Sequence, residues 1–130
     1  MNVLFIEDDA MNRRVVRDML GVAGVTMAEA ASAEKGLQMI DRNVYDVVLL
    51  DLRMPGMDGV TAIGHIRGRS DPKAALPIVV VTADTGPDLR QRCLAAGADD
   101  VIFKPVAMQQ LFDTVGRMLA KNAEGDGMIG

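Results

Sequence analysis

Four short apolar runs in this chain of 130 residues each end in polar side chains that can handle a metal ion or a phosphoryl group. Short runs rich in branched residues are typical of buried parallel strands. Because ligands of an open parallel sheet bind just beyond the carboxyl ends of its strands, we expect the four run ends to converge on one spot. That spot would hold a carboxylate cluster, a hydroxyl and one ammonium group. The polar residues are Glu7, Asp8 and Asp9 after Val3–Ile6, Asp51 after Val47–Leu50, Thr82 after Ile78–Val81, and Lys104 after Val101–Phe103.

The clustered carboxylates of Glu7, Asp8 and Asp51 would repel one another unless a cation lies among them. Two unit charges about 4 Å apart cost about 4 kcal/mol at an effective dielectric constant near 20. Hard oxygen ligands with no His or Cys nearby favour Mg²⁺, which keeps several waters and prefers sites completed by phosphate oxygens. Asp9 has a simpler interpretation, because an acid at a strand-to-helix turn can cap the helix that follows. The sequence therefore predicts a magnesium site.

Strand-like and helix-like segments alternate along the chain, which predicts an α/β fold: a doubly wound, five-stranded parallel sheet with helices on both faces. The second strand is the most polar because Glu29 lies inside it, and an edge position would explain this polarity. The last helix has the clearest helical spacing of apolar residues. The expected strands cover residues 3–7, 25–31, 45–50, 77–82 and 100–103, and the expected helices cover residues 10–22, 33–42, 58–69, 86–97 and 106–120.

Composition and charge narrow the class of protein. Hydrophobic residues make up 49% of the chain, enough for one domain with a real core. The net charge is −4 and no basic block stands out, so we expect no nucleic-acid partner. No apolar stretch could span a bilayer, and the first residues lack a signal peptide, so no membrane partner is expected. Cys93 is the single cysteine and is expected to be buried, which suits a reducing, cytoplasmic location.

The end of the chain is rich in glycine after Lys121. We expect a domain over residues 1–121 and a flexible C-terminal tail over residues 122–130. A starting Met1 together with such a tail favours a complete small protein.

Three motifs resemble the receiver domain of two-component response regulators, over about residues 3–119. They are Asp51-Leu52-Arg53-Met54-Pro55-Gly56-Met57-Asp58-Gly59, Gly97-Ala98-Asp99-Asp100, and Lys104-Pro105. The resemblance implies a flavodoxin-like (βα)5 fold with strand order 2-1-3-4-5. It also implies a role in phosphorelay signalling, either as a stand-alone receiver or as the receiver of a hybrid kinase.

The resemblance assigns roles to the acidic residues. Asp51 would be the nucleophile that accepts a phosphoryl group from a phosphohistidine, on a histidine kinase or a histidine phosphotransfer protein. Asp8, Asp51 and the backbone carbonyl of Arg53 would bind Mg²⁺ directly, whereas Glu7 would act through water. The longer side chain of Glu7 leaves direct ligation open. Beyond its own phosphorylation and dephosphorylation, such a domain is not an enzyme.

Thr82 and Lys104 would complete the phosphate site. Lys104 is a point cation that could reach a phosphoryl oxygen, and the resemblance implies a cis bond to Pro105 that aims the lysine inward. The Thr82 hydroxyl would contact the phosphate, with small Ala83 leaving access. Backbone N–H groups of Arg53 and Ala83 would complete the cradle.

One position departs from the family pattern. Receiver domains commonly carry Tyr or Phe three residues before the lysine, and here this switch position is Val101, which has no ring to move. Phe103 shares the face of Val101 but is not assumed to replace the ring. The response to phosphorylation is expected between Thr82 and Leu89, and a downstream protein partner is expected on helix 4, strand 5 and helix 5.

Residues on two of the expected helices lie outside the strand-end motifs. Met11, Asn12 and Val15 share a face at the start of the first helix and could dock the phosphodonor. His65 has no charged or metal-binding neighbour in sequence and is expected to be incidental.

A Mg-dependent phosphatase that uses a strand-end Asp would need a second carboxylate two residues later, where Arg53 stands. A flavin or nucleotide binder would need a phosphate-binding loop where the first acidic run lies. A pseudo-receiver that only binds partners is the remaining alternative.

Overall fold

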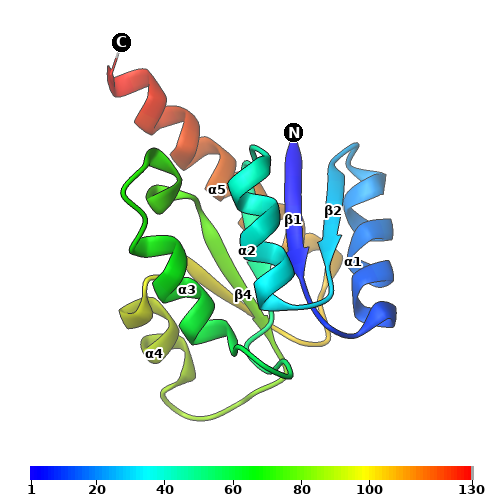
Figure 1. The fold of residues 1–130 in the computed structure, drawn as a ribbon. Coiled ribbons are helices and arrows are strands. Elements are labelled where there is room, and N and C mark those ends of the chain that lie inside the picture. Colours follow the sequence, from blue (N-terminus) through cyan, green and yellow to red (C-terminus); the bar gives the residue numbers. More distant parts are fainter. Residues whose placement is uncertain (130) are drawn as a thin grey trace.

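Five parallel strands form one sheet in the order β2-β1-β3-β4-β5, as seen in a computed structural model of the chain (Figure 1). The structure describes the backbone of residues 1–129 and the side chains of residues 1–121. The strands are β1 (Asn2–Ile6), β2 (Thr26–Ala30), β3 (Val47–Leu50), β4 (Ile78–Thr82) and β5 (Asp100–Phe103). The helices are α1 (Ala10–Val22), α2 (Ala33–Arg42), α3 (Gly59–Arg67), α4 (Leu89–Ala96) and α5 (Met108–Ile129), with a short 3₁₀ helix, η1 (Pro72–Ala75).

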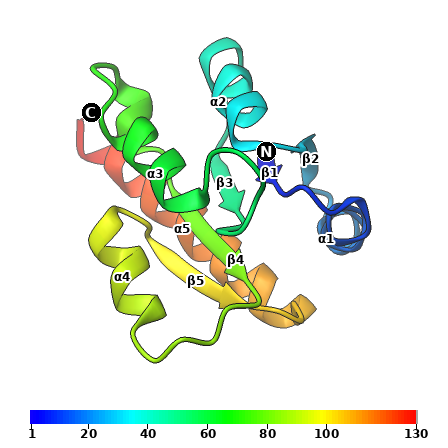
Figure 2. The same ribbon diagram turned by 60° about the horizontal axis from the view of Figure 1, so that its bottom comes forward.

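The predicted fold class, strand count and strand order are confirmed. β2 lies at an edge of the sheet, as expected from the polar Glu29 within it. All neighbouring strands pair in parallel, and the arrowheads of β1, β2 and β4 in Figure 1 point the same way, so the carboxyl ends of the strands lie at one edge of the molecule. Figure 2 turns this edge toward the viewer.

Helix starts follow from the capping residues. Asp9 accepts hydrogen bonds from the N–H groups of the first turn of α1, as predicted, and Ser32 does the same for α2. Both helices have the predicted bounds. α4 begins at Leu89 rather than at residue 86, because Gly86 and Pro87 remain in the loop, and Asp88 makes no side-chain capping bond. The 3₁₀ helix was not predicted.

Two hydrophobic cores lie on opposite faces of the sheet. One is formed with α2, α3 and α4, and contains the buried Cys93 and Val101. The other is formed with α1 and α5. Figures 1 and 2 show the corresponding layers, with α5 behind the sheet and α2 and α3 in front. β3 is apolar and buried along its whole length because both of its faces are covered.

The last helix is longer than predicted. α5 reaches Ile129, whereas the periodicity predicted an end near residue 120. The side chains of residues 122–130 lie outside the described part of the chain, so the flexible tail and the domain boundary at residue 121 stay predictions. Within the described residues, no helix has both the length and the apolar character needed to cross a bilayer.

Alanine substitutions at two helix glycines should change the stability of the protein in opposite directions. Gly36 in α2 is buried, and a Cβ atom there would meet the side chain of Ile6 in β1 within overlap distance. Gly64 in α3 is exposed and would meet nothing within 4 Å. Gly36→Ala should therefore destabilise the protein by about 1–3 kcal/mol through overpacking. Gly64→Ala, the matched control, should stabilise it by roughly 0.5–1 kcal/mol through helix propensity.

Urea unfolding midpoints would check both values. Equal changes in the two variants would contradict the close approach of α2 to β1.

Candidate functional site

Three carboxylates meet where β1 and β3 end. Glu7, Asp8 and Asp51 each place a carboxylate oxygen within 4.8 Å of the others. Their backbone is fixed by the sheet: Glu7 N–H donates to the carbonyl of Ala30, and Asp51 N–H donates to that of Ile6, at 2.9 and 3.0 Å. Glu7 is fully buried and Asp51 is 6% exposed, whereas Asp8 is exposed. The structure thus brings together the predicted acids, with one of them open to solvent.

Lys104 reaches this cluster from the end of β5. Its Nζ atom lies 2.6 Å from Glu7 Oε1 and 3.5 Å from Asp51 Oδ2. Its backbone N–H donates to the carbonyl of Thr82 at 2.8 Å, which continues the β4–β5 pairing past the strand ends. The Lys104–Pro105 peptide bond is cis. Without a phosphoryl group, the ammonium is therefore bound more closely to Glu7 than to Asp51.

Burial and neighbouring charges move the pKa values of this ion pair. Burial and the nearby Asp51 carboxyl raise the pKa of Glu7, and Lys104 offsets only part of this. Burial alone would lower the pKa of Lys104, but its hydrogen bond with Glu7 and the attraction of Asp51 outweigh it and raise the pKa. The lysine faces two carboxylates and stays charged, whereas ionised Glu7 costs free energy in the metal-free protein.

The first turns of α1 hold Glu7 through two further side chains. Asn12 Nδ2 donates to Glu7 Oε1 at 3.0 Å. Arg13 Nη1 donates to the backbone carbonyl of Glu7 at 2.7 Å, while its Nε donates to Glu29 on the edge strand β2. Sequence reasoning missed both contacts. The spacing of five and six residues from the acid is a signal that could have suggested them, because the first helix starts beside the strand end.

The carboxylate oxygens of the cluster are suited to hold a metal ion. Glu7 Oε2 is buried and has no hydrogen-bond partner among the described residues. A buried carboxylate oxygen without a partner costs free energy, so it marks a place for a cation or a bound water. All three carboxylates offer hard oxygen donors, and the exposed Asp8 leaves the cluster open on one side. The acids therefore fit a hard divalent cation.

Thr82 is buried at the end of β4, and its hydroxyl accepts a hydrogen bond from Asp84 N–H at 3.1 Å. Asp84 in turn accepts from Gly86 N–H and pairs with Arg53 at 3.0 Å. The hydrogen bond from the Gly86 N–H is the main cause of the lowered pKa of Asp84, and the hydrogen bond from the Arg53 guanidinium adds to it. The loops after β3 and β4 are thus joined by one ion pair, which the sequence did not suggest.

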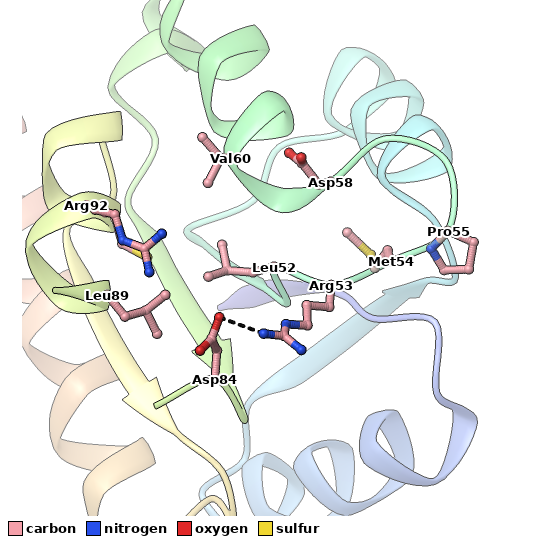
Figure 3. Close-up of a pocket in the computed structure, with 10 residues that line it drawn as sticks. Leu52, Arg53, Met54, Pro55, Asp58, Val60, Asp84, Leu89 and Arg92 are labelled. Atoms are coloured by element: carbon pink, nitrogen blue, oxygen red, sulfur yellow. Dashed lines mark hydrogen bonds and ion pairs between the residues drawn. The ribbon is translucent and has the colours of Figure 1, made fainter. Parts of the chain in front are cut away.

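A cavity of about 570 Å³ lies beside this ion pair, between α3 and α4. Figure 3 shows the Arg53–Asp84 pair among the residues that line this cavity, together with the apolar side chains of Leu52 and Leu89. α3 can begin close by because residue 59 is glycine: a Cβ atom at Gly59 would lie 2.7 Å from the carbonyl oxygen of Asp51.

The proposed docking residues divide into two kinds. Met11 and Val15 are 65% and 41% exposed on α1, whereas Asn12 is half-buried and turns toward Glu7. Asn12 and Val15 also line a groove of about 210 Å³ that includes Pro105.

Three further positions considered from the sequence, Val101, Phe103 and His65, are not members of the acid cluster. Val101 is buried at 2% exposure, and Phe103 is 38% exposed. His65 lies exposed in the last turn of α3.

Comparison with known proteins agrees with this geometry. The model of the response regulator receiver domain family matches residues 3–116. The sensor histidine kinase RcsC of Salmonella typhi is 36% identical over 115 residues, which are 88% of this chain and 12% of that kinase. The response regulator MprA of Mycobacterium leprae is 32% identical over 97% of this chain and 54% of its own length. The chain thus spans a small part of the hybrid kinases that it matches.

Solved structures give the same result. The Vibrio cholerae chemotaxis protein CheY4 has 30% identity and a TM-score of 0.83, covering 91% of this chain and 98% of that one. The receiver domain of the sensor histidine kinase PA1611 from Pseudomonas aeruginosa has 29% identity and a TM-score of 0.83, covering 92% and 97%. That structure has a magnesium ion coordinated in the active-site cleft. The chain therefore belongs to the response regulator receiver domain family of two-component signalling.

The raised pKa of Glu7 predicts a pH-dependent effect of Glu7→Gln in metal-free protein. A carboxyl whose folded pKa lies above its ordinary value of 4.5 stabilises the fold below that value and loses this contribution as the pH rises. Glu7→Gln should therefore stabilise the protein by about 1 kcal/mol at pH 8, and by much less near pH 4. Urea unfolding with a chelator at both pH values would check it. A difference that stays constant with pH would contradict the assignment.

Proposed function

We propose that this receiver accepts a phosphoryl group from a phosphohistidine donor onto Asp51 in a Mg²⁺-dependent reaction. The observation that carries the proposal is the convergence of a nearly buried Asp51 with two other acids and Lys104 at one sheet edge. The N–H group of Asp51 donates to the carbonyl of Ile6, which fixes the backbone of Asp51 at the sheet edge. The donor would be a histidine kinase or a histidine phosphotransfer protein.

The side chains would divide the work of phosphoryl transfer. A carboxylate oxygen of Asp51 forms a bond to phosphorus as the bond between phosphorus and the donor imidazole breaks. Bound Mg²⁺ would neutralise charge on the transferred group. Lys104 moves its ammonium from Glu7 onto a phosphoryl oxygen, and the Thr82 hydroxyl turns toward another. Backbone N–H groups of Arg53 and Ala83 complete the cradle.

Asp8, Asp51 and the backbone carbonyl of Arg53 would bind the metal, and Glu7 would bind it directly or through water. The unpartnered Glu7 Oε2 atom supports this role, because a cation or a metal-bound water would satisfy it. The magnesium ion in the PA1611 receiver supports the choice of metal.

The test of the phosphoacceptor is a mass measurement. Incubation with acetyl phosphate and Mg²⁺ should add one phosphoryl group to the intact chain, and Asp51→Asn should abolish the addition. Asp46→Asn is the control, because Asp46 lies before β3, at the opposite end of the strand from Asp51. Labelling of Asp51→Asn at the wild-type rate would refute the assignment, and the pseudo-receiver alternative predicts no labelling of any variant. Repeated turnover with release of free phosphate from many substrates would instead favour the phosphatase alternative.

The phosphodonor is proposed to dock on the exposed apolar start of α1. Met11 and Val15 present apolar surface beside the groove that reaches Pro105, which suits a helical partner. Met11→Glu and Val15→Glu should slow transfer from a phosphodonor protein by about tenfold, because a buried interface charge costs at least 1.4 kcal/mol. Transfer from acetyl phosphate should change by less than about twofold.

Val22→Glu is the control for this docking prediction. Val22 is 73% exposed at the far end of α1, so its charge should affect neither transfer. Equal slowing of both transfers by Met11→Glu would contradict a docking role.

The phosphorylated state is proposed to be read by a downstream protein at α4, β5 and α5. Val101 is buried and has no ring to swing, so the change must reach that face by another route. Residues 83–88 form a loop between the Thr82 end of the phosphate site and α4. A movement of Thr82 toward a phosphate would break its hydrogen bond with Asp84 and release this loop.

A further inference from the structure

Asn12 occupies an unexpected place for a docking residue. Its amide donates a hydrogen bond to Glu7 Oε1. The same oxygen accepts a hydrogen bond of 2.6 Å from the ammonium group of Lys104. Glu7 is fully buried, and its other oxygen has no hydrogen-bond partner among the described residues. Among the described residues, one carboxylate oxygen of Glu7 therefore has two donors and the other has none.

Phosphoryl transfer creates a difficulty for Glu7. In the proposed function, Lys104 leaves Glu7 to bind a phosphoryl oxygen. A buried carboxylate that loses a charged donor is destabilised unless another donor remains on the same oxygen. The movement of Lys104 would then be opposed by the free energy lost at Glu7.

We propose that Asn12 is a positioning residue that keeps Glu7 Oε1 hydrogen-bonded when Lys104 moves to the phosphoryl group. This inference rests on the proposed function and extends it to a residue outside the acid cluster. Asn12 suits the role because its amide is neutral, so it supports the carboxylate without competing with a divalent cation. It is also fixed in position: it lies in the first turn of α1, whose start is set by the Asp9 cap.

Beryllofluoride with Mg²⁺, a mimic of the phosphoryl group, tests the proposal through a double-mutant cycle. Asn12→Leu should weaken binding of the mimic by about tenfold, because in the bound state it removes the remaining donor to a charged group. In a Lys104→Met background the same change should alter binding by less than about twofold. There, Asn12 is the donor to Glu7 both before and after binding, so its loss costs the same in both states.

Thermal unfolding of metal-free protein gives a readout that does not depend on phosphorylation. With Lys104 present, Asn12→Leu should change the midpoint little, because the ammonium still serves Glu7 Oε1. In the Lys104→Met background it should lower the midpoint by about 5 °C, because the buried oxygen loses its last donor. Asn12→Leu should thus weaken mimic binding mainly when Lys104 is present and lower the unfolding midpoint mainly in the Lys104→Met background. A general loosening of α1 would not produce this pattern.

Asn43→Leu is the matched control. It also removes a side-chain amide hydrogen bond of 3.0 Å, to Met39 O at the end of α2, but it lies far from the acids in the fold. It should not affect binding of the mimic in either background. Asn12→Ser, whose side chain is too short to reach Glu7, should repeat the result of Asn12→Leu if leucine disturbs α1.

The outcomes separate this inference from the proposed function. If Asn12→Leu does not change mimic binding, or changes it equally in both backgrounds, the proposal is overturned. The phosphoacceptor role of Asp51 then still stands. If wild-type protein neither binds the mimic nor takes up a phosphoryl group, the proposed function fails and the proposal fails with it. The proposal is supported if Asn12→Leu weakens mimic binding only with Lys104 present and lowers the unfolding midpoint only in the Lys104→Met background.

Discussion

Repulsion among carboxylates at one edge of a parallel sheet is the constraint on which this structure depends. The fold places Glu7 and Asp51 at adjacent strand ends, with Asp8 within 4.8 Å, and buries the first two. Water cannot fully solvate those charges, so the protein must supply cations or donors at the same place. Lys104 supplies one positive charge, which is fewer than the acids require. The imbalance is what makes the site receptive to a metal ion.

The supports of the acids come from elements remote from the reacting carboxylate. Arg13 joins the end of β1 to Glu29 on the edge strand, so a polar residue in β2 helps to fix the position of Glu7. Arg17 pairs with the other oxygen of Glu29. The polarity of this edge strand therefore has a structural use beyond protecting an exposed edge. Its contribution to stability is modest, because these pairs are partly exposed, but it restricts the backbone next to the acids.

The elements and the members of the acid cluster could be predicted from the sequence because both follow from local patterns. Apolar runs predict strands, capping residues predict helix starts, and parallel topology brings the residues after each strand to one edge. The pairing within the cluster could not be predicted. Whether Lys104 binds Glu7 or Asp51 depends on side-chain rotamers and on a difference of 2.6 against 3.5 Å. Sequence spacing placed Asn12 on the outer face of α1, although its amide points to Glu7, because one helical turn contains both exposed and inward positions.

α4 shows how the same reasoning fails where local signals are weak. Its start lacks a side-chain cap, and it buries only Leu89 and Cys93 among its own residues. Few buried apolar contacts mean that little free energy opposes displacement of such a helix. The helix also follows directly on the loop that the Thr82–Asp84 hydrogen bond holds. Under the proposed function, a receiver without an aromatic ring at residue 101 therefore still has a route from the phosphate site to α4, since this weakly anchored helix follows the loop connected to Thr82.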